Sequence, residues 1–450
     1  MRLDKEDQTG TLMSSLDDAK LRRVQWKWTL IAAFGDYLDA GAIVAGGASL
    51  AEWIKFFHLH TSLIGIIAAL SANGIAAGVG AILAGRLGDL YGRKVIYAFD
   101  LLFYAFGVLV IIFSFNAAML VTGYMLIGLA VGADVPTSWS LIAEFSPKKS
   151  RGKLMGLTNI FWYIGPIIML VLSLVFSPLG ILGARLVFAS LGIVALIAWV
   201  LRRQIPESAR WSYNKGQIEK VDAVISKVGG TNSHETIQEP ALKMSRVKEL
   251  FTKKYVKRLW IITPLYLLWL IPAGTYGFFL PYIFRTLGDA TPARADILQI
   301  MWFASAIITV LVVYMPLNDR INRRVLYVIS AAFCSIAFFL FVFFPITNPI
   351  VAIANVLLFG FGQGIGLWPL QRVWSVELFP TEIRNTAQGF LWAIARFGLG
   401  FWSLALPFIT KDVGFTLIAA LLGTMFVGSM IIGGIWGPKT EGPAHQINTF

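Results

Sequence analysis

The sequence predicts an all-α integral membrane protein with twelve transmembrane helices. Of its 450 residues, 57% are hydrophobic and only 14% are charged, and the mean hydropathy is +0.70. Soluble proteins carry about 25% charged residues, so this chain has too few for a surface that faces water. Apolar stretches of ~20 residues, each able to cross ~30 Å of hydrocarbon, recur along the chain. Lys and Arg concentrate in alternate loops, as in membrane proteins of many spans.

The apolar runs and the loop charges together define a topology. We place spans at residues 28–50, 62–85, 95–113, 117–143, 153–176, 181–202, 258–284, 295–316, 324–345, 348–376, 384–409 and 412–437. An even number of spans puts both termini on one side. Only five of the 38 Lys and Arg residues lie in loops on the other side, namely Lys55, Arg185, Arg285, Arg294 and Lys411. Positive loops mark the cytoplasm, so we expect both termini inside a bacterial-type plasma (inner) membrane.

The chain divides into two similar halves. We expect a tail (1–27), a six-helix bundle (28–202), a central loop (203–257), a second six-helix bundle (258–437) and a second tail (438–450). "EFSPKKSR" (144–151) matches "ELFPTEIR" (377–384), "GDLYGRK" (88–94) matches "NDRINRR" (318–324), and "PESARW" (206–211) matches "PKTEG" (438–442), with offsets of 230–233 residues. A duplication relates the bundles by a pseudo-two-fold axis, and such transporters bind solute between them near the midplane.

Several other classes of function are disfavoured. The single cysteine, Cys334, allows no intrachain disulfide, and four scattered histidines form no cluster of metal ligands. No nucleophile–base pair or phosphate-binding loop is present, so we expect no enzyme and no cofactor. The net charge of +13 is explained by cytoplasmic loops and not by nucleic-acid binding. Short tails without an output domain argue against a solute sensor.

At these motifs the chain resembles the major facilitator superfamily. "GRLGDLYGRK" (85–94) is similar to its signature loop between the second and third helices. "PESARW", "PKTEG" and the repeated Glu-x-x-Pro-x-x-x-Arg resemble the sugar porter branch and its bacterial metabolite–proton symporter relatives, including inositol transporters. The resemblance implies alternating access by a rocking pair of bundles. It also implies a cytoplasmic gate of paired charges, for which the candidates are Gly85, Asp89, Arg93, Glu144, Arg151, Asp319, Arg323, Glu377 and Arg384.

Ionisable residues inside spans are costly and mark function. Asp36 and Asp39 in "GDYLDAG" lie three residues apart, so they share one helix face, and Asp39 lies ~17 Å along the first span. The resemblance makes Asp39 the better candidate for the proton-binding acid, with Asp36 and Asp134 as further candidates. Sugar porters pair that acid with an Arg in the fourth helix, where this chain has Tyr124. Either Asp39 is unpaired until it is protonated, or its partner comes from elsewhere, such as Asp134 through a shared proton or Arg396 across the cavity.

The candidate solute contacts are polar, aromatic and cationic. By resemblance Asn159 takes the place of a Gln that holds sugar hydroxyls, and Arg372 in "WPLQR" takes the place of a Trp. Amides donate and accept hydrogen bonds, aromatic rings stack on a pyranose or cyclitol, and Arg clamps carboxylates. For Arg372 a structural pair with a span acid or with Glu377 is an equal alternative. The full set is Asn159, Trp162, Tyr163, Trp269, Tyr276, Gln363, Trp368, Gln371, Arg372, Trp392 and Arg396.

Two functions remain open. The first is proton-coupled uptake of a sugar, polyol or cyclitol such as inositol by a monomer in the lipid bilayer. The second is proton-coupled transport of a small organic anion, such as a sugar acid or an aromatic, nicotinate-like acid, with Arg372 or Arg396 as the counter-ion.

Overall fold

The computed structural model describes residues 20–147, 150–228, 247–318 and 320–438. In these ranges twelve helical segments are long and apolar enough to cross a membrane, which confirms the predicted fold class. The first six are α2 (Arg23–Phe57), α3 with α4 (Thr61–Leu70 and Ile75–Tyr91), α5 (Arg93–Ile112), α6 (Ala117–Phe145), α7 with the turn η2 (Arg151–Phe176 and Ser177–Leu179) and α8 (Ile181–Arg202).

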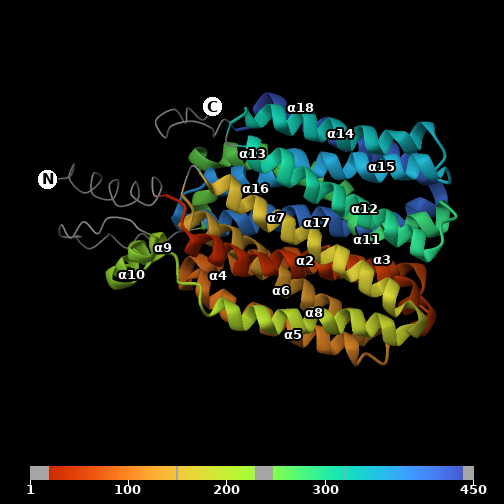
Figure 1. Cartoon of the computed structure of the whole chain (residues 1–450), viewed down its shortest axis with the longest axis horizontal. Helices are drawn as coiled ribbons and strands as arrows, with labels where there is room; N and C mark the ends of the chain where they lie inside the picture. Colours follow the sequence, from red (N-terminus) through yellow and green to blue (C-terminus); the bar gives the residue numbers. More distant parts are fainter. Residues whose placement is uncertain (1–19, 148–149, 229–246, 319, 439–450) are drawn as a thin grey trace.

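The second half repeats this arrangement after the segment that connects the halves. Between the halves lie α9 (Ala209–Asn214), α10 (Ile218–Val228) and the turn η3 (Val247–Phe251). The last six spans are α11 (Lys253–Leu287), α12 with η4 and α13 (Pro292–Thr309, Val310–Tyr314 and Met315–Leu317), α14 (Arg323–Phe343), α15 with η5 and α16 (Pro349–Gly362, Gln363–Leu367 and Trp368–Glu377), α17 (Thr381–Val413) and α18 (Phe415–Trp436). In Figure 1 the spans lie lengthwise, with α9 and α10 beyond one end of them.

Some helices are longer than the apolar runs that predict them. α2 begins at Arg23, five residues before the expected span, because Gln25 accepts a hydrogen bond from the backbone N–H of Arg22 (2.8 Å) and closes the first turn. It ends at Phe57, because the next residue, His58, has a positive φ of 50° that stops the helix. Hydropathy measures the length of the apolar run, whereas backbone hydrogen bonding continues into the polar flanks.

Two spans are interrupted near the middle of the molecule. The second span breaks at Ser71–Gly74, where the Ser71 hydroxyl accepts a hydrogen bond from the backbone N–H of Asn73 (3.1 Å). The tenth span contains the π-helical turn η5, at which Ser330 of α14 donates to the carbonyl of Gly362 and accepts from the N–H of Leu367 (2.7 Å). Side chains thus satisfy backbone groups that the helices leave free, as burial in a membrane requires.

The two halves meet through reciprocal helix pairs. The first spans of the halves, α2 and α11, pack together. In the second span of the first half, α4 packs on α17, which is the fifth span of the second half. In the same way α7, the fifth span of the first half, packs on α12, in the second span of the second half. This exchange of partners is what a pseudo-two-fold axis between two similar bundles produces.

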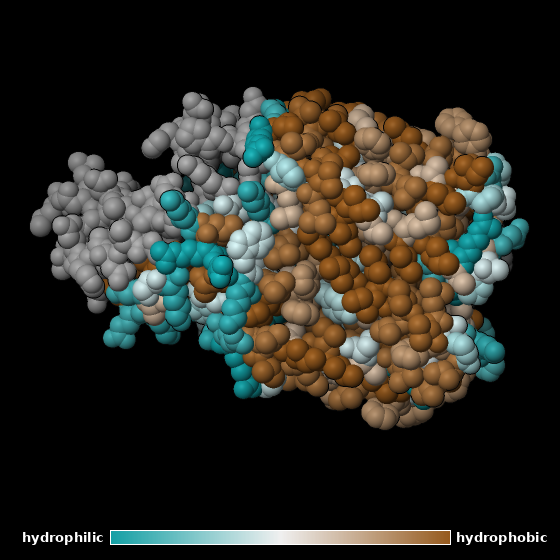
Figure 2. All heavy atoms as spheres, in the orientation of Figure 1, coloured by the Kyte–Doolittle hydropathy of each residue, from teal (hydrophilic) through white to brown (hydrophobic). Residues whose placement is uncertain are grey.

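The surface has the pattern of a protein that spans lipid. On the face seen in Figure 2, a broad hydrophobic band covers the spans and is bordered by hydrophilic residues at both ends. Large apolar side chains such as Phe99, Phe115 and Ile350 are 67–77% exposed. In water such a band would be unstable, whereas hydrocarbon chains cover it without cost.

Candidate functional site

Two of the three carboxylates of α2, those of Asp36 and Asp39, each contact an Arg of the opposite bundle. Asp36 Oδ1 lies 2.6 Å from Arg372 Nη2 on α16, and Asp39 Oδ1 lies 3.1 Å from Arg396 Nη2 on α17. All four side chains are buried, each at most 2% exposed. Removal of one partner of such a pair leaves a buried charge without compensation and strongly destabilises a protein, so the members of each pair depend on one another across the two bundles.

Tryptophans surround both ion pairs. The Arg372 guanidinium lies 4.2 Å from the ring centroids of both Trp139 and Trp368, and that of Arg396 lies 4.3 Å from the ring of Trp392. We define the central tryptophan cluster as Trp139, Trp162, Trp269, Trp368 and Trp392, from α6, α7, α11, α16 and α17. Cation–π contacts of this kind gain strength when water is excluded.

Two indole N–H groups of this cluster complete the carboxylate contacts. Trp139 Nε1 donates to Asp36 Oδ1 (3.3 Å), and Trp162 Nε1 donates to Asp39 Oδ2 (3.1 Å). Trp269 stacks on Trp368 with ring centroids 4.1 Å apart and planes 11° from parallel. The acids, the guanidinium groups and the indoles therefore form one continuous network between the bundles.

A narrow cavity adjoins this network. Its lining includes Asn73 of the second-span break, Trp162, Trp269, Gly274 and Arg396. The volume accessible to the centre of a water molecule is about 10 Å³, room for about one water. The two bundles are therefore closed around the centre in this conformation.

Buried polar atoms of the site are left without protein partners. Within the described residues, Asn159 Oδ1, Tyr163 Oη, Trp392 Nε1 and Arg396 Nη1 are buried and make no hydrogen bond. Unsatisfied buried groups are costly, and a polar ligand is one way to satisfy groups of this kind. The set includes both donors and acceptors, as a hydroxylated solute requires.

Three other candidates lie farther from the ion pairs. Tyr276 packs in the C-terminal bundle and its hydroxyl lies 3.3 Å from Asn355 Oδ1. Gln371 Nε2 donates to the carbonyl of Leu265 (2.9 Å), away from Asp36. Gln363 Oε1 accepts from Trp269 Nε1 (2.8 Å) and so supports a member of the tryptophan cluster.

Asp134 has a partner of its own within the first bundle. Its Oδ2 lies 2.8 Å from Arg202 Nη2, and its Oδ1 accepts a hydrogen bond from the Ser138 hydroxyl (2.9 Å). Of the two partners considered for Asp39, the structure shows Arg396 in contact. Arg372 contacts a span acid, Asp36, whereas Glu377 contacts Arg323 (2.8 Å).

The predicted gate residues gather at the end of the spans where α9 and α10 lie. Arg93 Nη2 lies 2.9 Å from Glu144 and 3.0 Å from Asp89, and all three belong to the first bundle. The opposite bundle reaches this group through Arg384, which lies 3.4 Å from Glu144, and through Thr386, whose hydroxyl donates to Asp89 (2.6 Å).

A second contact between the bundles lies at the same end. Arg151 at the start of α7 lies 3.6 Å from Glu377 at the end of α16. Asp319, the remaining gate candidate, lies outside the described residues. We call Asp89, Arg93, Glu144, Arg151, Glu377 and Arg384 the end cluster, and its contacts join the bundles in the conformation observed.

Small residues allow two helices of opposite bundles to touch beside the end cluster. A Cβ atom added to Gly389 of α17 would lie 2.2 Å from the carbonyl oxygen of Ala81 on α4, and one added to Gly85 would lie 2.8 Å from that of Asn385. Such contacts are available only to residues without side chains. Gly85 thus has a packing role within the predicted gate.

Gly389→Ala is expected to open this end of the molecule. The added methyl group needs more than 1 Å of extra separation from the α4 backbone, so the end cluster loses its contacts between bundles. Spin labels at the exposed residues Tyr91 and Ile321 should report a longer distance. Gly428→Ala on α18, where the nearest atom is a Leu268 methyl at 3.4 Å, is the matched control and should leave the distance unchanged. An unchanged distance in Gly389→Ala would mean that this helix crossing does not hold the end closed.

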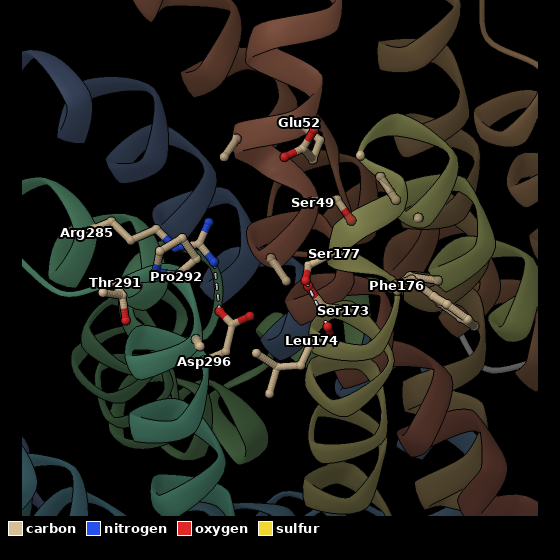
Figure 3. Close-up of a pocket in the computed structure, with 17 residues that line it drawn as sticks. Ser49, Glu52, Ser173, Leu174, Phe176, Ser177, Arg285, Thr291, Pro292 and Asp296 are labelled. Carbon is tan, nitrogen blue, oxygen red and sulfur yellow. Dashed lines mark hydrogen bonds and ion pairs between the residues drawn. The ribbon is translucent and has the colours of Figure 1, made fainter.

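At the opposite end the bundles are separated by a wide pocket. Its accessible volume is about 420 Å³, and Figure 3 shows Ser49 and Glu52 on one side and Arg285, Thr291 and Asp296 on the other. Arg285 is paired with Asp296 within the second bundle (3.0 Å). Pockets of 300–1,000 Å³ accommodate small molecules, so this pocket is large enough to admit one.

Sequence patterns do not single out some residues of the site. Trp139 donates a hydrogen bond to Asp36, and Thr158 accepts one from Arg372. In the sequence, both look like ordinary residues of apolar helices. Asn73 has a detectable signal, because an Asn-Gly step inside an apolar run favours a helix break.

Comparisons with known proteins show the family to which the chain belongs. The family model described as "Sugar (and other) transporter" matches residues 28–442. The chain belongs to this family of major facilitator superfamily transporters. It is similar to the minor myo-inositol transporter IolF of Bacillus subtilis (strain 168), with 36% identity over 93% of the chain and 92% of IolF. The niacin transporter NiaP of Acinetobacter baylyi is 23% identical over 96% of the chain and 98% of NiaP.

The fold of this sugar transporter family also appears in a solved structure. The proton:xylose symporter XylE, bound to 6-bromo-6-deoxy-D-glucose, superimposes with a TM-score of 0.77 at 20% identity, over 93% of the chain and 96% of XylE. The chain is therefore a multi-pass membrane transporter of small-molecule solutes, and its relatives are transporters and not enzymes. The Asp–Arg pairs between the bundles occupy the centre of this transporter.

Proposed function

We propose that the protein takes up a neutral polyol or cyclitol, such as inositol, together with protons, across the plasma membrane. The observation that carries the proposal is that Asp36 and Asp39 of α2 both contact guanidinium groups of the opposite bundle. Similarity to the inositol transporter IolF supports the solute class. The excess of Lys and Arg in the loops supports a cytoplasmic location for the α9–α10 end.

Charge balance favours a neutral solute. Arg372 and Arg396 each face one carboxylate, so the two pairs carry no net charge. While both acids are ionised, a carboxylate solute would add an uncompensated negative charge to a buried site, which is costly in a medium of low dielectric. A polyol adds only hydroxyl groups, and these match the unpaired donors and acceptors of Asn159, Tyr163 and Arg396.

Protonation of Asp39 links proton binding to bundle movement. A proton that arrives through the wide pocket neutralises Asp39 and weakens its attraction to Arg396. The guanidinium group then donates to solute hydroxyls instead, while Trp392 and Trp162 pack against the apolar face of the ring. When the end cluster opens, proton and solute leave to the cytoplasm, and Asp39 regains Arg396. An equilibrium biased by a few kcal/mol is enough for such a cycle.

The alternative function is transport of a small organic anion, as the similarity to the niacin transporter NiaP allows. In that case Arg372 or Arg396 binds the carboxylate after Asp36 or Asp39 has taken up a proton. This alternative predicts that Arg372→Gln abolishes uptake of the acid. Retained uptake of the acid by Arg372→Gln would assign Arg372 to the structural pair with Asp36.

A transport assay separates the two solute classes. In proteoliposomes with an inward proton gradient, the purified protein should accumulate labelled myo-inositol and should not accumulate nicotinate. Bound solute stabilises the folded state, so myo-inositol should also raise the melting temperature and nicotinate should not. Accumulation of nicotinate without accumulation of any polyol or sugar would refute the proposal in favour of the anion transporter.

A further inference from the structure

A second buried network lies inside the first bundle, apart from the central pairs. Arg202 at the end of α8 bridges two carboxylates, with Nη1 2.9 Å from Asp100 Oδ2 on α5 and Nη2 2.8 Å from Asp134 Oδ2 on α6. The three residues are at most 5% exposed. We call Asp100, Asp134 and Arg202 the bundle triad.

The charges of the bundle triad do not balance when both acids are ionised. Two carboxylates face one guanidinium group, which leaves one negative charge in a buried site within the spans. The other contacts of the acids are neutral donors, namely the backbone N–H of Leu101 (2.6 Å) and the hydroxyl of Ser138 (2.9 Å). Tyr97 lies over Arg202 and donates to Ser138, so it supplies no positive charge either.

The bundle triad touches the helix that carries the central acids. A Cβ atom at Gly35 of α2 would lie 1.7 Å from Asp134 Oδ2 and 2.5 Å from Arg202 Nη2. Asp36 is the next residue after Gly35 on α2, and Asp39 lies about one helical turn farther along the same helix. A change of charge in the triad is therefore felt by both acids at the centre.

We propose that Asp100 and Asp134 form a second proton-binding site, in which the two carboxylates share one proton while both contact Arg202. With this proton the triad has no net charge, as burial in a medium of low dielectric favours. Two carboxylates held in one site cannot both ionise easily, which is the physical basis of proton sharing. The inference concerns the resting protein and does not depend on the identity of the solute.

Infrared spectroscopy of the purified full-length protein tests this site. The wild type should show the carbonyl stretch of a protonated carboxylic acid, and Asp100→Asn and Asp134→Asn should each remove the same band. Either substitution leaves one ionised acid paired with Arg202, which needs no proton. Asp296→Asn, in the one-to-one pair with Arg285, is the matched control and should leave the band unchanged. Survival of the band in either triad variant would overturn the shared proton.

Thermal stability gives an independent test that needs no spectroscopic assignment. Each single Asn variant mimics the protonated acid, so its melting temperature should equal or exceed that of the wild type. The double variant Asp100→Asn/Asp134→Asn leaves Arg202 buried without a counter-charge and should melt lower than either single variant. If both acids are ionised and paired in the wild type, each single variant melts lower than the wild type, and the proposal is wrong.

Discussion

Asp39→Asn is expected to abolish solute accumulation driven by a proton gradient while solute exchange continues. One proton per solute and an inward gradient of two pH units allow up to about 100-fold accumulation, because a pH unit and a tenfold concentration ratio are each worth about 1.4 kcal/mol. The amide keeps a hydrogen bond from Arg396 but binds no proton. Its internal and external solute concentrations should therefore become equal, as measured with labelled myo-inositol in proteoliposomes.

The matched control for this experiment lies on the same helix face. Asp36→Asn also removes a carboxylate that faces an Arg of the opposite bundle, so it tests whether loss of charge alone stops coupling. If Asp39 is the proton carrier, Asp36→Asn lowers the rate and keeps a concentration ratio above one. If both variants accumulate solute as the wild type does, the coupling mechanism is refuted.

Arg372→Met is expected to destabilise the folded protein by about 3–5 kcal/mol, because it leaves Asp36 buried without its counter-charge. The side chain of Arg372 is fully buried between two indole rings, and methionine fills part of the same space. In a thermal unfolding assay in detergent, this variant should show one of the largest losses of melting temperature among single substitutions at the centre.

A double substitution separates lost charge from lost packing. Asp36→Leu/Arg372→Met removes both members of the pair, so most of the stability should return, since replacing a buried ion pair by apolar residues is often neutral. Equal instability of the single and double variants would mean that packing against Trp139 and Trp368, and not charge, is what Arg372 supplies.

The sequence predicts much of the fold because the fold depends on local patterns. Apolar runs locate all twelve spans, and the three-residue spacing of Asp36 and Asp39 places both acids on one face of α2. The pairing of Asp39 with Arg396 joins residues 357 positions apart. Such a contact depends on the register between α2 and α17, which neither helix encodes in its own periodicity.

Residues near helix ends are harder to interpret from sequence. Arg202 is the last residue of α8 and looks like one of many cytoplasmic charges, yet its side chain extends into the bundle and contacts Asp100 and Asp134. Long Arg side chains reach several ångströms from their backbone, so position along a span does not fix the depth of the charge. Sugar porters carry an Arg at the position of Tyr124 on α6, and this chain does not. Here the counter-charge of Asp39 comes instead from Arg396 on α17.

The most direct test of the central claim, that Asp39 carries a proton with each solute, is proton movement driven by solute alone. Proteoliposomes loaded with a pH-sensitive dye receive myo-inositol outside, with equal pH on both sides at the start. The lumen of wild-type vesicles should acidify as labelled solute enters, and the lumen of Asp39→Asn vesicles should not. Solute entry into wild-type vesicles without any change of lumen pH would contradict the account.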